Sequence, residues 1–159
     1  MHGREHHYRV SVHWTGNRGP GTTSYAAYGR DHVVRAPGKP DLLGSSDPAF
    51  RGDATRYNPE DLLVASLSAC HMLWFLHLAA EAGVIVTDYR DEPEGTMVED
   101  RDRGGYFTRV VLHPAVTVAP GIETGRLDAI HRDAHKHCFI ANSVNFPVDI
   151  APTAGTAPA

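Results

Sequence analysis

The sequence predicts an α+β protein with a mostly antiparallel sheet. Three observations lead to this fold class. The first part of the chain carries short strand-like segments, a long apolar helical segment follows over residues 59–82, and further strand-like segments separate it from a second helical segment over residues 124–137. Chains that group their strands apart from their helices are typical of α+β folds.

The first strands are predicted between residues 8 and 34. Residues 8–14 alternate apolar and polar side chains at period two, which indicates a strand with one buried face. The Gly-rich stretch 15–21 is a turn, and residues 22–25 and 32–34 continue the meander. Residues 36–58 hold several Pro and Gly residues and little periodicity, so we expect a long loop there. Loops of this length are uncommon unless they have a function.

The predicted central helix has a start signal and a stop signal. Pro59 suits the first turn of a helix, and Asn58 before it is a favourable N-cap. Gly83 supplies the expected end. The segment between them is apolar on nearly all sides, which is typical of a helix enclosed by protein.

The remainder of the chain is predicted to complete one domain over residues 1–150. Strands are expected over residues 84–89, 95–99 and 106–118, the last interrupted by Pro114, and a final strand over residues 146–150. Residues 151–159 are rich in Ala, Pro and Thr, and we expect this tail to be disordered.

Composition narrows the class of function. A chain of 159 residues suggests one domain with one sizeable core. Its net charge of −4 gives no basic footprint for nucleic acid. We found no apolar run as long as a membrane span and no stretch like a signal peptide, so we expect no membrane partner and a cytoplasmic location.

The two cysteines are the first candidates for chemistry. Cys70 lies in the central helix and Cys138 closes the second one. Two thiols on two helices can form a redox pair, in which one sulfur is oxidised and the other resolves it. They can equally be inert core residues, because free cysteine is among the most buried residue types. The residues alone leave both interpretations open.

A reactive Cys70 would need a nearby cation, because the thiolate is the reactive species and an apolar environment disfavours it. Arg51 and Arg56 lie in the long loop before the helix, and Arg18 lies in the first turn. Glu60 precedes Cys70 by about 15 Å of helical rise, so it cannot touch the thiol. Its carboxylate could still orient an arginine that reaches the sulfur.

Histidines offer a weaker alternative. His71 with His77, or His131 with His135 and Cys138, have spacings that can bind zinc. No fourth ligand motif accompanies either set, so we expect no metal site.

Two sequence blocks match one family. The segment Asn58-Pro59-Glu60, which leads into Cys70, resembles the signature of the OsmC/Ohr family, the osmotically inducible and organic hydroperoxide resistance proteins. The segment 135–143 around Cys138 is similar to the family's A-H-x-x-C-x-x-S/A-N region. The resemblance covers residues 8–150 and includes the order of the elements.

The resemblance implies an OsmC-like fold, an intertwined homodimer and a thiol-dependent peroxidase acting on organic or other hydroperoxides. Carried over residue by residue, Cys70 would attack the peroxide and Cys138 would resolve the sulfenic acid as a disulfide. Glu60 would orient the catalytic arginine, for which we favour Arg51 over Arg18. The resemblance implies no bound cofactor and an external dithiol reductant, of which a lipoyl-type dithiol is the expected example.

A second function on the same fold stays open. The chain could be a redox sensor or a small-molecule-binding protein whose thiols do not turn over. His71 stands where many family members carry an apolar or aromatic residue, and the loop before the central helix is longer than in the Ohr branch. The enzyme is favoured because both cysteines, the glutamate and candidate arginines are all present.

Overall fold

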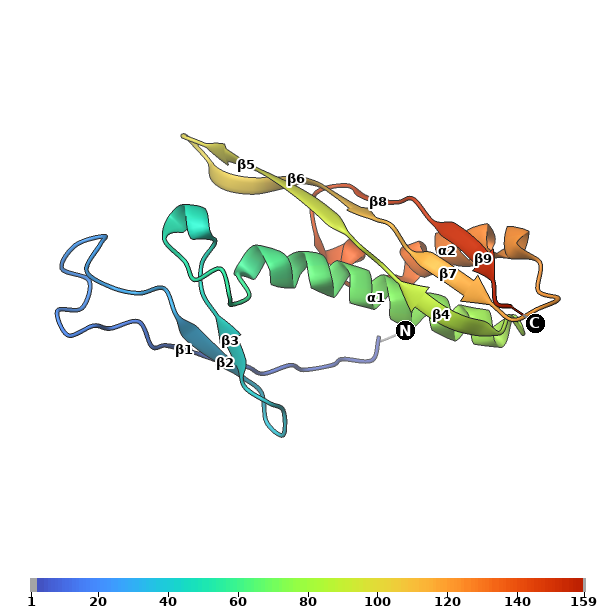
Figure 1. Ribbon diagram of the computed structural model, residues 1–159, viewed down its shortest axis with the longest axis horizontal. Helices are drawn as coiled ribbons and strands as arrows, with labels where there is room; N and C mark the ends of the chain where they lie inside the picture. Colours follow the sequence, from blue (N-terminus) through green and yellow to red (C-terminus); the bar gives the residue numbers. More distant parts are fainter. Residues whose placement is uncertain (1–2, 159) are drawn as a thin grey trace. The chain divides into compact units, whose positions relative to one another are not determined.

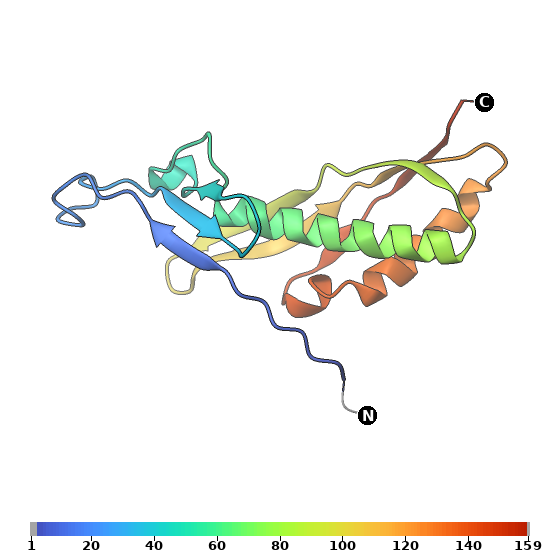
Figure 2. The same ribbon diagram turned by 90° about the horizontal axis from the view of Figure 1, so that it is seen from below.

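The computed structural model describes residues 3–158. The chain divides after Leu62 into two compact units, residues 1–62 and residues 63–159, and each is described by itself. Figure 1 gives the order of the elements along the chain, and Figure 2 turns the same ribbon by 90°. The expectation of a single domain over residues 1–150 stays a prediction.

The first unit is built on a three-stranded antiparallel meander. Strands β1 (Ser11–Trp14), β2 (His32–Arg35) and β3 (Leu42–Gly44) lie in the order β1-β2-β3. The predicted meander is present in part: residues 22–25 form turns and bends rather than a strand, and β1 is exposed along its whole length rather than buried on one face. The apolar side chains at the start of the chain thus have no cover within the described residues.

The predicted long loop is ordered by short elements and one buried side chain. It contains β3 and a short 3₁₀ helix, η1 (Pro48–Phe50). The Ser45 hydroxyl donates to Asp31 Oδ1 at 3.1 Å and accepts from the Asp53 N–H at 3.0 Å. Ser45 is completely buried, so its hydroxyl group needs hydrogen-bond partners within the protein. Its two bonds attach the loop to Asp31, just before β2, and to Asp53, further along the loop.

Helix α1 (Pro59–Glu81) begins and ends where the sequence predicts. The Asn58 side chain accepts from the Asp61 N–H at 2.7 Å, and the Asp61 carboxylate accepts from the Asn58 N–H at 3.2 Å. This reciprocal arrangement is a capping box, which satisfies N–H groups that have no partner within the helix. Gly83 ends the helix with φ +68°, a left-handed conformation that costs glycine little.

Only one stripe of α1 is buried. Leu67, His71, Phe75 and Ala79 follow each other at intervals of four residues and are buried, whereas Leu73 is 63% exposed. This chain by itself therefore buries one stripe of the helix, and enclosure of the remaining sides by protein stays a prediction. By length and composition alone α1 is apolar enough to cross a membrane, contrary to the sequence analysis, although core helices of soluble proteins meet the same criterion.

The second unit contains two three-stranded sheets. One has the order β4-β7-β9 and the other the order β5-β6-β8. Within each sheet one pair is antiparallel (β4 with β7, β5 with β6) and one is parallel (β7 with β9, β6 with β8). The strand bounds are Val86–Arg90 (β4), Glu94–Asp100 (β5), Gly104–Leu112 (β6), Ala115–Val118 (β7), Val148–Ile150 (β8) and Thr153–Thr156 (β9).

Strand β9 corrects the expectation of a disordered tail from residue 151. Residues Thr153–Thr156 pair in parallel with β7, in the register Ala115↔Thr153 to Val118↔Thr156. The strand is exposed, so the backbone hydrogen bonds of the sheet order it rather than buried side chains. The composition of this segment therefore does not indicate a strand, because backbone hydrogen bonds between strands do not require apolar side chains.

Helix α2 (Leu127–His137) packs beside α1 and is preceded by the 3₁₀ helix η2 (Thr124–Arg126) (Figure 2). Together these two elements cover the predicted helix 124–137. Phe75 and Ala79 of α1 share a buried cluster with Leu127, Ile130 and Ala134 of α2 and its neighbours. A short 3₁₀ helix, η3 (Ala141–Ser143), leads from α2 towards β8.

Candidate functional site

Aromatic contacts join α1 to α2 beside the two cysteines. The Trp74 ring lies 5.2 Å from the His137 ring and 5.5 Å from the Phe139 ring, measured between centroids. Trp74 stands one helical turn after Cys70, and His137 and Phe139 flank Cys138. The same contact that packs the helices therefore brings the two cysteine-bearing segments together.

Both cysteines are free thiols and differ in burial. Cys70, on α1, is half-buried, and Cys138, at the C-cap of α2, is 1% exposed. The Cys138 Sγ accepts a hydrogen bond from the Ala141 N–H at 3.5 Å. Burial raises the pKa of Cys138 to about 11, opposed by this N–H and reinforced by a hydrogen bond with the Cys70 side chain. Cys138 is thus a protonated thiol near neutral pH, with Cys70 as its neighbour.

A pair of buried histidines lies in the same helix contact. His71 Nε2 and His131 Nδ1 are 3.0 Å apart, and the two rings are parallel within 5°. The His131 ring also stacks on Phe75 at 4.2 Å between centroids. Burial lowers the pKa of each histidine to about 4, so both are neutral near pH 7 and share one proton across the hydrogen bond.

The sequence analysis missed this pair, although it named both residues. It treated His71 as a departure from a family pattern and His131 as a candidate zinc ligand. The spacing of His71 from Leu67 and Phe75, four residues on either side, places it on the buried stripe and was the available signal. Nothing local indicated the partner, which lies sixty residues further along the chain.

A second polar contact anchors α1 close to Cys70. Ser68 Oγ donates to Asp91 Oδ2 at 2.5 Å, and the other Asp91 oxygen accepts from the His113 N–H at 2.7 Å. Asp91 therefore ties the helix to the segment that joins β6 to β7. A cavity of about 310 Å³ adjoins this contact, and it is lined by Ala65, Ser68, Ala69, Met72, Tyr89, Asp91 and Pro93.

The large apolar side chains of α1 that follow Cys70 have different surroundings. Phe75 is completely buried in the core, and Trp74 packs against α2. Met72 lines the cavity beside Asp91, and Leu76 lines another beyond the helix end.

The other predicted site residues lie in the first unit. Arg18 is exposed in the turn after β1, Arg51 follows η1 with φ +65°, and Glu60 lies in the first turn of α1. Within residues 3–62, neither arginine forms an ion pair with Glu60; the ion pairs there link Arg35 to Asp41, Arg56 to Asp31 and Asp53, and His7 to Glu5. The roles of Arg18, Arg51 and Glu60 stay predictions.

The candidate zinc ligands do not form a metal centre. Across residues 3–158, no three histidine, cysteine, aspartate or glutamate side chains are grouped so that they could hold a metal ion. One ring nitrogen of His71 is instead hydrogen-bonded to one ring nitrogen of His131.

Comparison with known proteins identifies the family. The model of the OsmC-like protein family matches residues 52–153. The chain belongs to this family. An OsmC-like protein of unknown function from Vibrio cholerae is 30% identical to it, and the two structures align over 93% of this chain and 99% of the other with a TM-score of 0.85.

Two organic hydroperoxide resistance proteins share the fold of this OsmC-like chain at lower identity. One, from Legionella pneumophila, is 19% identical with a TM-score of 0.70, and the alignment covers 96% of this chain and 99% of that one. The other, from Bacillus subtilis, is 18% identical with a TM-score of 0.61, covering 94% and 98%. No curated protein matches the chain.

These findings confirm the resemblance to OsmC/Ohr proteins and the α+β, OsmC-like fold with its two helices.

Proposed function

We propose that this OsmC-like protein is a thiol-dependent peroxidase that reduces organic or other hydroperoxides through Cys70 and Cys138. The observation that carries the proposal is the contact between a half-buried thiol and a fully buried one, on two helices packed together. Membership in a family with hydroperoxide resistance proteins supports the choice of substrate.

The reaction has three balanced steps. The Cys70 thiolate attacks the distal oxygen of the hydroperoxide, the O–O bond breaks, and the products are a Cys70 sulfenic acid and, after protonation, an alcohol. The Cys138 thiol then attacks the sulfenic sulfur, which forms a disulfide and releases water. An external dithiol, for which a lipoyl-type compound is our candidate, reduces the disulfide by two electrons, so the protein itself needs no bound cofactor.

The burial of the thiols supports this division of roles. Peroxide must reach the attacking sulfur from solvent, and Cys138 is 1% exposed with its pKa raised to about 11. A buried, protonated thiol is a poor first nucleophile. Cys70 is more accessible, so the first attack falls to Cys70 and the resolution to its neighbour.

The decisive test compares the two cysteines in a stopped-flow assay with cumene hydroperoxide and a dithiol. Cys70→Ser should lose all peroxide reduction. Cys138→Ser should keep one fast turnover, with a sulfenic acid detected by mass spectrometry, and lose sustained turnover because no disulfide forms. The conservative Ser68→Ala variant, which leaves both thiols, controls for disturbance of α1.

If the wild type and Cys70→Ser consume peroxide equally slowly, the protein is not a peroxidase. Reversible oxidation without turnover would then favour the redox-sensing or small-molecule-binding alternative.

We further propose that Arg51, oriented by Glu60, is the cation that activates Cys70. A guanidinium beside a sulfur favours the thiolate, so Arg51→Ala should slow sulfenic acid formation by about tenfold or more, and Arg51→Lys less. Arg18→Ala is the matched variant, and its rate should stay near that of the wild type. If Arg18→Ala slows sulfenic acid formation and Arg51→Ala does not, the activating cation is Arg18, in the turn after β1.

A homodimer is the assembly we propose. Two apolar surfaces support it: the β1 region, with Val12 65% and Tyr8 90% exposed, and the outer side of α1, with Leu73 63% exposed. Isolated exposed apolar residues are ordinary, but a long helix with an uncovered apolar side is typical of an interface. We keep the cytoplasm as the proposed location, where reduced thiols are stable.

A further inference from the structure

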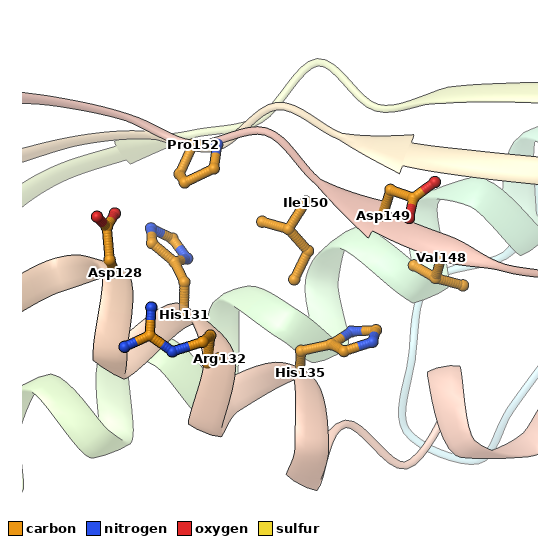
Figure 3. A pocket seen from close by; sticks show the side chains of 8 residues that line it. All are labelled: Asp128, His131, Arg132, His135, Val148, Asp149, Ile150 and Pro152. Carbon is orange, nitrogen blue, oxygen red and sulfur yellow. The ribbon is translucent and has the colours of Figure 1, made fainter.

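A cavity of about 360 Å³ lies between α2 and the segment around β8. Figure 3 shows its lining, with the side chains of α2 on one side and those of β8 and Pro152 on the other. The size lies in the range of small-molecule sites. Its walls are Asp128, His131, Arg132, His135, Val148, Asp149, Ile150 and Pro152, none of which the peroxidase chemistry uses.

The cavity contains an unpartnered atom on a buried side chain. His131 is 3% exposed and stands from α2 into the cavity between Asp128 and Ile150. Its Nδ1 is bonded to His71, but its Nε2 is buried without a hydrogen-bond partner among the described residues. Leaving a buried polar atom without a hydrogen bond is unfavourable, so a ligand that bonds with it gains binding free energy.

The hydrogen-bonding character of this nitrogen can take two forms. If His71 donates to His131 Nδ1, then His131 Nε2 carries a proton and donates into the cavity. If His131 Nδ1 donates instead, its Nε2 is an acceptor. A hydroxyl group both donates and accepts, and therefore satisfies Nε2 in either tautomer.

The charges around the cavity select against an ionic ligand. Asp128 and Arg132 carry opposite charges at its exposed rim, and the Asp149 carboxylate is paired with Arg109 at 2.6 Å. Asp128 and Arg132 together add no net charge, so the lining favours neither an anion nor a cation. His131 is neutral near pH 7, and a charge beside a buried neutral imidazole would lose its hydration without a counter-ion.

The other side of the cavity is apolar. Val148, Ile150 and Pro152 present hydrocarbon surface across from His131. A water molecule could form a hydrogen bond with Nε2, but it would not remove this hydrocarbon surface from water. The aliphatic part of a ligand would bury the surface, which is favourable.

We propose that this cavity binds a small neutral aliphatic alcohol, with its hydroxyl group on His131 Nε2 and its hydrocarbon body on Val148, Ile150 and Pro152. The site goes beyond the peroxidase function and does not depend on it, because neither cysteine lines the cavity.

The test titrates the labelled protein with cyclohexanol and follows the histidine ring nitrogens and the Ile150 methyl groups by NMR. Cyclohexanol should shift the His131 Nε2 and Ile150 signals in a saturable way, with a Kd of about millimolar for so small a ligand. Cyclohexane, cyclohexanecarboxylate and cyclohexylammonium should bind at least about tenfold more weakly, because they lack either the hydroxyl group or neutrality.

Two variants of the cavity and one control variant make the result specific. His131→Phe keeps a ring and removes Nε2, so it should weaken cyclohexanol binding by about tenfold. Pro152→Trp alters an exposed position and should block the cavity without touching the histidine pair. Lys136→Ala, exposed on the same helix but outside the cavity, should bind as the wild type does.

Equal binding of cyclohexane, stronger binding of the carboxylate or the ammonium, or no saturable shift would each overturn the proposal. If His131→Phe does not fold, Pro152→Trp decides. Loss of binding in Pro152→Trp supports the site, and unchanged binding refutes it.

Discussion

At the scale of single residues, the His71–His131 pair makes the interior of the second unit sensitive to acid. Both rings are buried and have one ring nitrogen without a partner among the described residues. A proton added to His71 would place a charge beside His131 and His135, and a proton added to His131 would place one beside His71. Asp128 and Asp91 oppose the pKa depression of His131 only in part.

We therefore predict that stability falls as pH falls from about 6.5 to about 4. The pKa of each histidine is 6.5 when unperturbed and about 4 in the fold, so in this window the unfolded chain binds protons that the native state does not. This histidine contribution to stability is therefore fully present above about pH 6.5 and is lost progressively as the pH falls towards 4. Urea unfolding at a series of pH values measures it.

Two variants separate the histidines from other titrating groups. His131→Leu alone should lose about 1–3 kcal/mol at pH 7, because His71 then lacks its partner. His71→Leu with His131→Leu should recover much of that loss and flatten the pH dependence between 4 and 6.5. A double variant with the wild-type pH profile would contradict the assignment.

At the scale of elements, local signals predicted the helices and failed for strand pairing. Asn58, Pro59 and Gly83 marked both ends of α1, because caps and stops are formed by residues adjacent in sequence. The pairing of β9 with β7 was missed, because parallel partners are distant and β9 has no apolar pattern.

The candidate site likewise contains residues that local sequence patterns indicated and contacts that they did not. Cys70 and Cys138 were candidates from the residues, but their pairing came from the family resemblance. The His71–His131 contact and the Ser68–Asp91 bond depend on tertiary packing, which no local pattern encodes.

We predict that the end of α1 requires a left-handed residue. Gly83 has φ +68°, so Gly83→Ala should lower the free energy of unfolding by about 1 kcal/mol, although alanine normally favours helices. Gly83→Asn should cost less, since asparagine tolerates this conformation. Urea midpoints compare the three proteins, and an alanine variant as stable as the wild type would contradict the capping role.

At the scale of the whole molecule, the chain leaves much apolar surface uncovered. The largest exposed apolar side chains include several from the β1 region and one from the middle of α1. In solution such surfaces favour association, and burying them supplies roughly 25 cal/mol for each Å² removed from water. This is why we connect the incomplete burial of α1 with a second copy of the chain.

We predict that Leu73→Lys shifts the protein from dimer to monomer in analytical ultracentrifugation. A lysine placed in an apolar interface would have to lose its hydration on association. Val98→Lys, an apolar-to-charged change at a partly exposed site on β5, is the control and should leave the sedimentation coefficient unchanged. A Leu73→Lys protein that sediments as the wild type does would remove α1 from the interface.

The parallel pairs that complete both sheets of the second unit also determine when this unit can fold. Val110 pairs with Val148, and Ala115 pairs with Thr153, so in each sheet the two partners are separated by α2 and its flanking segments. The conformational entropy of these large loops is lost before the strand contacts contribute any stabilisation. This order of events slows folding. During synthesis, α1 and the antiparallel pairs β4–β7 and β5–β6 therefore leave the ribosome before β8 and β9, the strands that finish their sheets. Until β8 and β9 have been synthesised, the edges of β6 and β7 with which they pair remain open. The nascent chain must avoid aggregation at these edges during that time.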